Sequence, residues 1–273
     1  MAKIGIFDSG YGGLTILSKI RSLLPQYDYV YLGDNARTPY GTRSFEVVYQ
    51  YTLQCVKTLF DKDCDLVILA CNTASAKALR TIQQLDLPQI SSTKRVLGVI
   101  RPTVEVVNSF TKNGKVGLLA TSGTVQSDSY AIEIAKLFPE IELTSLACPM
   151  WVPLIENREH DAAGADYFVS KNINQLLEQC PDMDTLILGC THYPLLLPKI
   201  KQYLPEQVQV ISQGDVVARS LKDYLNRHSE MEQGLDKNNS CTYFTTESVE
   251  KFNSLANVFL ESEVDAQQIV INS

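Results

Sequence analysis

The sequence predicts an α/β protein made of two pseudo-symmetric parallel-sheet domains that face each other across a cleft. Short continuous apolar runs alternate with longer segments of helical periodicity, and the second half of the chain repeats landmarks of the first. Continuous apolar runs are typical of strands buried on both faces, and their alternation with helices favours parallel pairing. The 273 residues are enough for two domains of ordinary size.

The apolar runs predict ten strands, and segments with apolar residues at three- and four-residue intervals predict helices. The predicted strands are Lys3–Phe7, Tyr29–Leu32, Leu66–Leu69, Val96–Val99, Val116–Leu119, Glu142–Leu146, Thr185–Leu188, Val208–Ile211, Tyr243–Thr245 and Ile269–Ile271. The predicted helices include Phe45–Phe60, Asp166–Glu178 and Val249–Leu260. The polar stretch Asn226–Ser240 is rich in turn-forming residues, which predicts a surface loop.

The internal repeat pairs an opening strand and small-residue turn with a later strand that ends in a cysteine. Lys3–Gly10 resembles Lys115–Ser122, and Asp65–Thr73 resembles Asp184–His192. Cys71 follows Asp8 by 63 positions, and Cys190 follows Thr121 by 69. Ligands of open parallel sheets bind beyond the carboxyl ends of the strands, where these four residues and Ser9 all fall. Two facing domains would therefore place the two cysteines on opposite walls of one cleft.

Composition and charge exclude several classes of protein. The net charge of −7 and pI of about 5.1 argue against nucleic-acid binding, which needs a dense basic face. No apolar stretch approaches the roughly 20 residues of a membrane helix, and the N-terminal apolar run is too short for a signal peptide. Seven cysteines without a CxxC pair indicate free thiols in a reducing compartment. We therefore expect a soluble cytoplasmic protein without nucleic-acid or membrane partners.

Cys71 and Cys190 are the leading candidates for chemistry. Each lies between a strand and a helix, where the helix N-terminus lowers the pKa of a thiol from about 8.5. A lone cysteine is more often a small buried hydrophobe, but two cysteines in matched settings favour a chemical role. The remaining cysteines lack this setting and are assigned structural roles: Cys55, Cys64, Cys148, Cys180 and Cys241.

His192 and Asp8 are candidates for acid–base work beside the thiols. His192, two positions after Cys190, can polarise the thiol or transfer protons near neutral pH. It could also be a helix residue without a role, or belong to a Cys-x-His zinc site, although no further ligands lie at metal spacing. Asp8 precedes a glycine-rich loop and is interpreted as a base or an anchor for a substrate ammonium; a helix N-cap is the alternative.

The segment Gly33–Gly41 reads as a loop that can bind a carboxylate. Its turn chemistry centres on Pro39 and Gly41. Tyr40 and the Gly41 N–H are candidate carboxylate ligands. Arg37 and Arg43 are either further ligands or simple surface charges, and surface charge is the commoner outcome.

Taken together, these motifs resemble those of the glutamate racemases, cofactor-independent enzymes of bacterial cell-wall synthesis. The matching segments follow the family's order from Phe7 to Pro194: Phe7–Gly10 with Gly12–Leu14, Gly33–Arg37 with Pro39–Gly41, Ala70–Ser75, Ala120–Thr121 with Thr124, Pro153–Glu156, and Gly189–Pro194. The resemblance implies L- and D-glutamate as substrates, no cofactor or metal, and a homodimer. It also supports adding the C-terminal tail to the first sheet, so the predicted domains are residues 1–98 plus 212–273 and residues 99–211.

The resemblance assigns roles to individual residues. Cys71 would deprotonate D-glutamate and Cys190 L-glutamate, with Asp8, His192 and Glu156 supporting the thiols. The implied substrate-binding residues are Asp8, Ser9, Tyr40, Gly41, Asn72, Thr73, Thr121, Thr124, Thr191 and His192. The chemistry agrees, because a weakly acidic α-proton needs preorganised donors when no pyridoxal lysine motif is evident.

Some features depart from the family pattern or leave other functions open. Tyr11 stands where a small aliphatic residue is common, and Met150–Trp151 lies in a segment that is usually plainer. The rival hypotheses are a racemase of aspartate or another amino acid, a non-catalytic amino-acid-binding protein, and a thiol hydrolase that uses Cys190 and His192.

Overall fold

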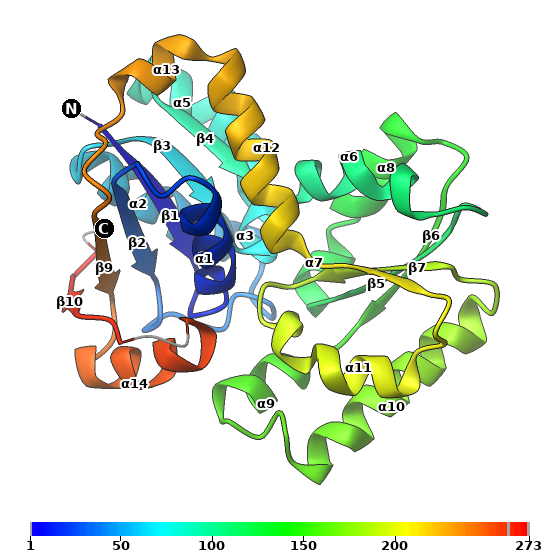
Figure 1. Cartoon of the computed structure of the whole chain (residues 1–273). Coiled ribbons are helices and arrows are strands. Elements are labelled where there is room, and N and C mark those ends of the chain that lie inside the picture. Colours follow the sequence, from blue (N-terminus) through cyan, green and yellow to red (C-terminus); the bar gives the residue numbers. More distant parts are fainter. Residues whose placement is uncertain (1, 261–262, 272–273) are drawn as a thin grey trace.

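Two parallel β-sheets, each covered by helices, form the framework of the molecule (Figure 1). The structure is a computed structural model that describes residues 2–260 and 263–271. The six-stranded sheet has the order β10-β9-β2-β1-β3-β4 and the four-stranded sheet the order β6-β5-β7-β8. Every strand pair in both sheets is parallel. The predicted α/β class with two parallel sheets is therefore confirmed.

Apart from β10, the strand bounds agree closely with the apolar runs. In the six-stranded sheet they are β1 (Lys3–Asp8), β2 (Tyr29–Gly33), β3 (Cys64–Leu69), β4 (Arg95–Gly98), β9 (Cys241–Thr245) and β10 (Ala266–Gln268). In the four-stranded sheet they are β5 (Lys115–Ala120), β6 (Glu142–Ala147), β7 (Thr185–Gly189) and β8 (Gln209–Ile211).

Helices follow most strands, as parallel connections require. In the part built on the six-stranded sheet they are α1 (Gly13–Leu23), α2 (Phe45–Asp61), α3 (Asn72–Lys77), α4 (Leu79–Thr81), η1 (Ile82–Asp86), α5 (Leu87–Ile90), α12 (Gln213–Arg227), α13 (Ser229–Gly234) and α14 (Val249–Leu260). Around the four-stranded sheet they are α6 (Ile100–Phe110), α7 (Ser122–Gln126), α8 (Ser129–Leu137), α9 (Trp151–Glu156), α10 (Ala163–Gln179), η2 (Tyr193–Leu196) and α11 (Leu197–Tyr203).

The chain crosses between the two sheets twice. It leaves the first sheet after β4 and returns after β8, where α12 packs along α1 and β9 later pairs with β2 (Figure 1). The C-terminal tail thus adds β9 and β10 to the first sheet. The residues chosen as domain boundaries, 98/99 and 211/212, stay a prediction, although the strands on either side of each belong to different sheets.

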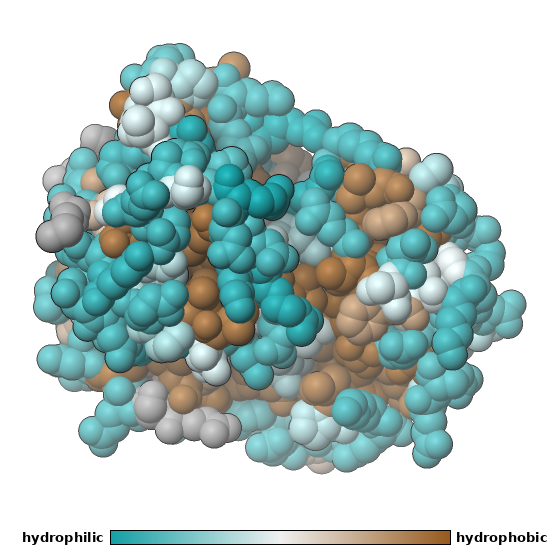
Figure 2. Space-filling view, turned by 45° about the horizontal axis from the view of Figure 1, so that its top comes forward, coloured by the Kyte–Doolittle hydropathy of each residue, from teal (hydrophilic) through white to brown (hydrophobic). Residues whose placement is uncertain are grey.

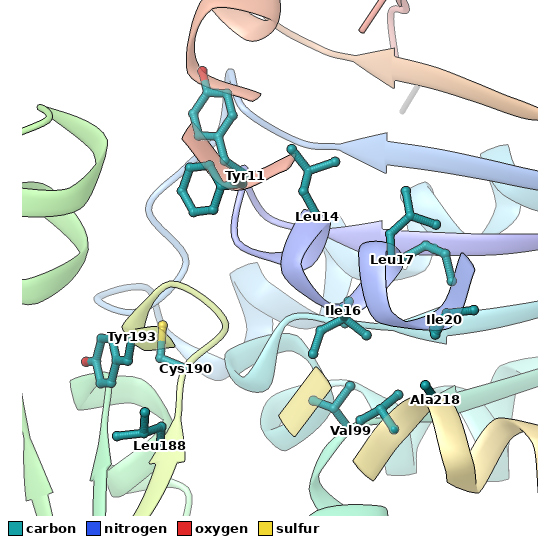
Figure 3. Packing of buried hydrophobic residues seen from close by; sticks show 14 of the residues in the cluster. Tyr11, Leu14, Ile16, Leu17, Ile20, Val99, Leu188, Cys190, Tyr193 and Ala218 are labelled. Carbon is teal, nitrogen blue, oxygen red and sulfur yellow. The ribbon is translucent and has the colours of Figure 1, made fainter. Parts of the chain in front are cut away.

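Burial of the central strands explains why their apolar runs are continuous. All five residues of β7 are buried, and so are Leu66–Leu69 of β3. Figure 3 shows Ile16 and Ile20 of α1 facing Val99 and Ala218, while Leu14 and Leu17 point to the other side of the helix. The surface seen in Figure 2 is mostly hydrophilic. Among the described residues, no helix is long and apolar enough to cross a membrane.

Two predictions about the C-terminal region are wrong. The last strand is Ala266–Gln268 rather than Ile269–Ile271, because buried Ala266 pairs with Tyr243 while the next apolar residues lie past the paired segment. Val270 is 79% exposed, so the apolar run there marks no buried strand. The predicted loop Asn226–Ser240 contains the helix α13, whose first turn carries acidic residues that suit a helix N-terminus.

Candidate active site

Four strand ends bring the candidate residues together at one edge of each sheet. Asp8 ends β1, Cys71 follows β3, Thr121 follows β5 and Cys190 follows β7. The register aligns Phe7 with Leu69 in one sheet, so Asp8 lies beside Ala70, the residue before Cys71. In the other sheet it aligns Ala120 with Gly189, so Thr121 lies beside Cys190. Figure 3 shows the Cys190 sulfur at the tip of β7.

Cys71 is the N-cap of α3 and is held as a thiol. Its Sγ accepts a hydrogen bond from the Ala74 N–H at 3.5 Å and lies 3.4 Å from Ser9 Oγ. Burial, together with the charges of Asp8 and Cys190, raises the pKa of Cys71 to about 12, although the Ser9 and Ala74 hydrogen bonds act in the opposite direction.

Asp8 is a buried carboxylate with one oxygen bound and one free. Its Oδ2 accepts the Gly10 N–H at 2.8 Å, whereas Oδ1 is buried and has no hydrogen-bond partner among the described residues. Burial raises the pKa of Asp8, and the nearby His192 charge partly offsets this rise. The N-cap of α1 is Gly12, and no side chain caps this helix. Asp8 therefore does not serve as the N-cap, and its Oδ1 is available for a proton or an ammonium group.

Cys190 has a different partner, a histidine backed by a carboxylate. His192 Nδ1 lies 3.8 Å from Cys190 Sγ, and His192 Nε2 lies 3.0 Å from Glu156 Oε1. Burial acts to lower the pKa of His192, but the interactions with Cys190 and Glu156 outweigh it and raise the pKa to about 10. His192 is therefore an imidazolium at neutral pH, and a cation beside a thiol favours the thiolate. The two thiols thus have unlike surroundings.

The loop around Gly12 needs a residue without a side chain. A Cβ at Gly12 would collide with Thr191 Oγ1 and His192 Nδ1. Thr191 is also fixed through its carbonyl oxygen, which accepts a hydrogen bond from Thr15 Oγ1 at 3.0 Å. The loop after β1 and the loop after β7 therefore touch directly and connect the two halves of the site.

A cluster of threonine hydroxyls lies between the two sheets. Thr73 Oγ1 is 2.9 Å from Thr121 Oγ1, and Thr124 Oγ1 is 3.1 Å from the same atom. Gly41 belongs to this cluster, since a Cβ there would lie 3.0 Å from Thr121 Cβ and its carbonyl accepts the Gly123 N–H at 2.8 Å. Four of the residues implied in substrate binding thus form one group of hydroxyl and backbone groups suited to a carboxylate.

The side chains of the Gly33–Gly41 loop are largely used to hold the loop itself. The Tyr40 hydroxyl donates to Asp34, and Arg37 Nε donates to the same carboxylate at 2.6 Å. Arg37 also donates to Gln54 at 2.6 Å and lies over the Tyr51 ring, 4.2 Å from its centroid. Arg37 therefore holds the loop in place. It is neither a free surface charge nor a ligand in the site.

Several residues near the site could not be found from the sequence pattern. Phe259 of α14 packs edge-on against His192, with ring centroids 5.3 Å apart. Tyr11 stacks against Phe252 and Phe259, so the tyrosine that departs from the family pattern is buried in an aromatic cluster. The Asn72 side chain is hydrogen-bonded to Gln213 and Tyr130 rather than left free. No local sequence signal links residues so far apart.

A separate cavity lies away from the two thiols. It has a volume of about 610 Å³ and is lined by residues of α3, α4, α6, α8 and α12, among them Lys77, Arg80 and Arg101. Within residues 2–260 and 263–271, no group of three or more His, Cys, Asp or Glu side chains is placed to hold a metal ion. The candidate active site is thus the contact region of the strand ends, not this cavity.

Known proteins similar to this chain agree with the fold and the site. The sequence profile described as Asp/Glu/Hydantoin racemase matches residues 13–221. A glutamate racemase of Geobacter metallireducens is 39% identical over 272 residues, which is 99% of this chain and 97% of that protein. The chain therefore belongs to the Asp/Glu/Hydantoin racemase family, whose glutamate racemase members are isomerases.

Solved structures of glutamate racemases share the whole fold. The RacE1 isoform from Bacillus anthracis has a TM-score of 0.90 at 36% identity, with 99% of this chain and 98% of that chain covered. The enzyme from Francisella tularensis, solved in complex with D-glutamate, has a TM-score of 0.86 at 33% identity and coverage of 100% and 97%. The two-domain arrangement of this chain matches that of these relatives.

Proposed function

We propose that this protein interconverts L- and D-glutamate by direct proton transfer between two cysteine thiols, without a cofactor. The observation that carries the proposal is the placement of Cys71 and Cys190 at the ends of β3 and β7, each with its own acid–base partner. The D-glutamate bound to the Francisella relative supports glutamate as the substrate. Racemisation needs an acid and a base on opposite faces of the α-carbon, and two thiols meet that need.

In the proposed reaction, one thiolate removes the α-proton and the other thiol protonates the opposite face. Cys71 acts as the base on D-glutamate and Cys190 as the base on L-glutamate. On the Cys190 side, the His192 imidazolium stabilises the thiolate, and Glu156 fixes the orientation of the ring. On the Cys71 side, the free Oδ1 of Asp8 accepts a proton from the thiol or from the substrate ammonium.

The carbanionic transition state needs donors that are in place before the reaction begins. The hydroxyls of Thr73, Thr121 and Thr124, with the backbone at Gly41, are grouped for this purpose. Hydrogen bonds to the substrate carboxylate strengthen as negative charge spreads onto it from the α-carbon. In the proposal Ser9, Thr191 and the backbone of Tyr40 and Asn72 complete the substrate site.

The test measures racemisation and solvent exchange in the same samples. Circular dichroism of L- or D-glutamate with the wild-type protein is expected to decay to zero, and deuterium from D₂O is expected at the α-position. Cys71→Ala and Cys190→Ala should each abolish the decay, while Cys241→Ala, which alters a cysteine outside the site, should not. Full racemisation by either site variant would refute the two-thiol mechanism.

The same assay separates the rival functions. A racemase of aspartate would act on aspartate and leave glutamate unchanged. A binding protein would bind glutamate without incorporating deuterium, and a thiol hydrolase would form a covalent intermediate with esters. We also propose that the protein works in the cytoplasm as a homodimer and supplies D-glutamate for peptidoglycan. Analytical ultracentrifugation tests the dimer, and D-glutamate rescue of a depletion strain tests the cell-wall role.

A further inference from the structure

Four buried polar side chains meet where the chain crosses between the two sheets. Gln213 begins α12 just after β8, and Thr103 lies in the first turn of α6 just after β4. Asn72 begins α3, and Tyr130 lies in α8. All four side chains are buried. We call these residues (Asn72, Thr103, Tyr130 and Gln213) the crossing network.

The hydrogen bonds of the crossing network fit a single arrangement of donors and acceptors. Gln213 Oε1 accepts from Asn72 Nδ2 at 2.6 Å, and Gln213 Nε2 donates to Thr103 Oγ1 and to Tyr130 Oη, both at 2.9 Å. The Tyr130 hydroxyl donates to Asn72 Oδ1 at 2.8 Å. Buried networks in which every group is paired hold one geometry firmly, because breaking any bond leaves an unpaired polar group.

The crossing network acts on the segment that carries Cys71. Cys71 is the N-cap of α3 and Asn72 is its first residue, so a fixed Asn72 side chain fixes the first turn of this helix. That turn also supplies the Ala74 N–H that donates to Cys71 Sγ. Gln213 thus contacts Asn72, the residue after Cys71, but does not contact the thiol itself.

Gln213 also connects to the part of the molecule that carries Cys190. It follows β8, which pairs with β7, the strand that ends at Cys190. Thr103 lies in α6 and Tyr130 in α8, two helices that cover the second sheet and pack against each other. We infer that Gln213 is a positioning residue that holds the Cys71 segment in register with the second domain. The expected effect of Gln213 on proton transfer rests on the proposed function.

The geometry predicts that loss of the Gln213 amide exposes the Cys71 thiol and leaves the Cys190 thiol unaffected. The partner of Cys190 is His192, which is held in turn by Glu156, and neither residue belongs to the crossing network. Loss of the Gln213 amide therefore loosens the first turn of α3 and leaves the end of β7 in place. A general loss of stability would instead expose both thiols alike.

The experiment compares alkylation of the two thiols by iodoacetamide in the folded protein. Gln213→Met removes the amide and keeps the side-chain length. Gln209→Met is the matched control, because Gln209 is an exposed glutamine at the same crossing that donates to the Phe110 carbonyl. Mass spectrometry of the peptides containing Cys71 and Cys190 gives the rate at each sulfur.

In Gln213→Met we expect the alkylation rate of Cys71 to rise at least about threefold, through local opening of α3, while that of Cys190 stays at the wild-type value. Gln209→Met is expected to change neither rate. The value of kcat/KM for glutamate should fall roughly tenfold to a hundredfold in Gln213→Met, since small displacements of a reacting group are costly.

Tyr130→Phe tests the inference with a milder change. It removes one hydroxyl and leaves the ring packed, so the same selective rise at Cys71 is expected with a smaller size. Unchanged Cys71 rates in both variants, or parallel rises at Cys71 and Cys190, would overturn the inference. The alkylation rates do not depend on catalysis, so a wild-type protein that fails to racemise glutamate rejects the proposed function alone.

Discussion

His192 Nε2 lies 3.0 Å from Glu156 Oε1, on the side of the ring opposite Cys190. The carboxylate comes from the end of α9 and the histidine from the turn after β7, so two separate segments of the second domain form this pair. A buried imidazole would ordinarily lose its proton, yet the interactions with Cys190 and Glu156 together raise the pKa of His192 to about 10. The charged histidine is what makes the Cys190 half of the site different from the Cys71 half.

Glu156→Gln is expected to lower kcat/KM for glutamate by about tenfold to a thousandfold. The amide keeps the shape of the carboxylate but removes the charge that holds His192 protonated. The Cys190 thiolate then loses its stabilising cation. The pH profile of kcat/KM for the variant should shift, because His192 then loses its proton at a lower pH. A profile identical to that of the wild type would contradict this role. Glu159→Gln, at an exposed neighbouring glutamate, is the matched control.

The same pair predicts how stability depends on pH. The pKa of His192 in the folded protein, about 10, lies above the unfolded value of about 6.5, so the folded state binds the proton more tightly. Its contribution to stability is fully present below about pH 6.5 and is lost as pH rises towards 10. The Tm difference between wild type and Glu156→Gln should therefore shrink over this range. A constant difference from pH 6 to pH 10 would show that the pair is not coupled to protonation.

Much of the site could be predicted because its residues follow strands directly. Asp8, Cys71, Thr121 and Cys190 each end a buried apolar run, and parallel pairing then brings them to common edges. Periodicity reports only local structure, so it could not reveal contacts between distant segments. The Gln213–Asn72 bond joins residues 141 positions apart, and nothing near either residue signals the other.

Two further differences have the same physical origin. Phe259 reaches His192 because α14 packs beside α1, a tertiary contact that no pattern within α14 records. Apolar β-branched residues favour strands and predict the last strand at Ile269–Ile271, but its position is set by the pairing of Ala266 with Tyr243. At this position the strand pairing, rather than the local strand propensity, determines where β10 lies.

Gly12→Ala is expected to abolish most of the activity while leaving the protein folded. The added methyl group would collide with Thr191 Oγ1 and His192 Nδ1, and so push the imidazole away from Cys190. We expect kcat/KM to fall about a hundredfold, because the thiolate loses its oriented partner. Gly164→Ala is the matched control, since a Cβ there has nothing within 4 Å and alanine suits a helix better than glycine. Equal activities of the two variants would contradict this account.

Asp8→Asn is expected to stop racemisation and at the same time to stabilise the protein at neutral pH. Burial raises the pKa of Asp8, and its Oδ1 has no partner among the described residues, so the folded protein carries a poorly compensated charge. Because the folded state holds the proton more tightly than the unfolded state, ionisation of Asp8 costs stability once the pH rises above its unfolded pKa. The neutral amide removes that cost and can still accept the Gly10 N–H.

We expect Tm of Asp8→Asn to rise by roughly 2–4 °C at pH 7 to 8 and the gain to shrink as the pH falls towards 4. Differential scanning calorimetry across this range is the measurement, with Asp223→Asn at an exposed aspartate as the control. A lower Tm for Asp8→Asn at pH 7, or retained racemisation, would show that the carboxylate is a structural group rather than a strained catalytic one.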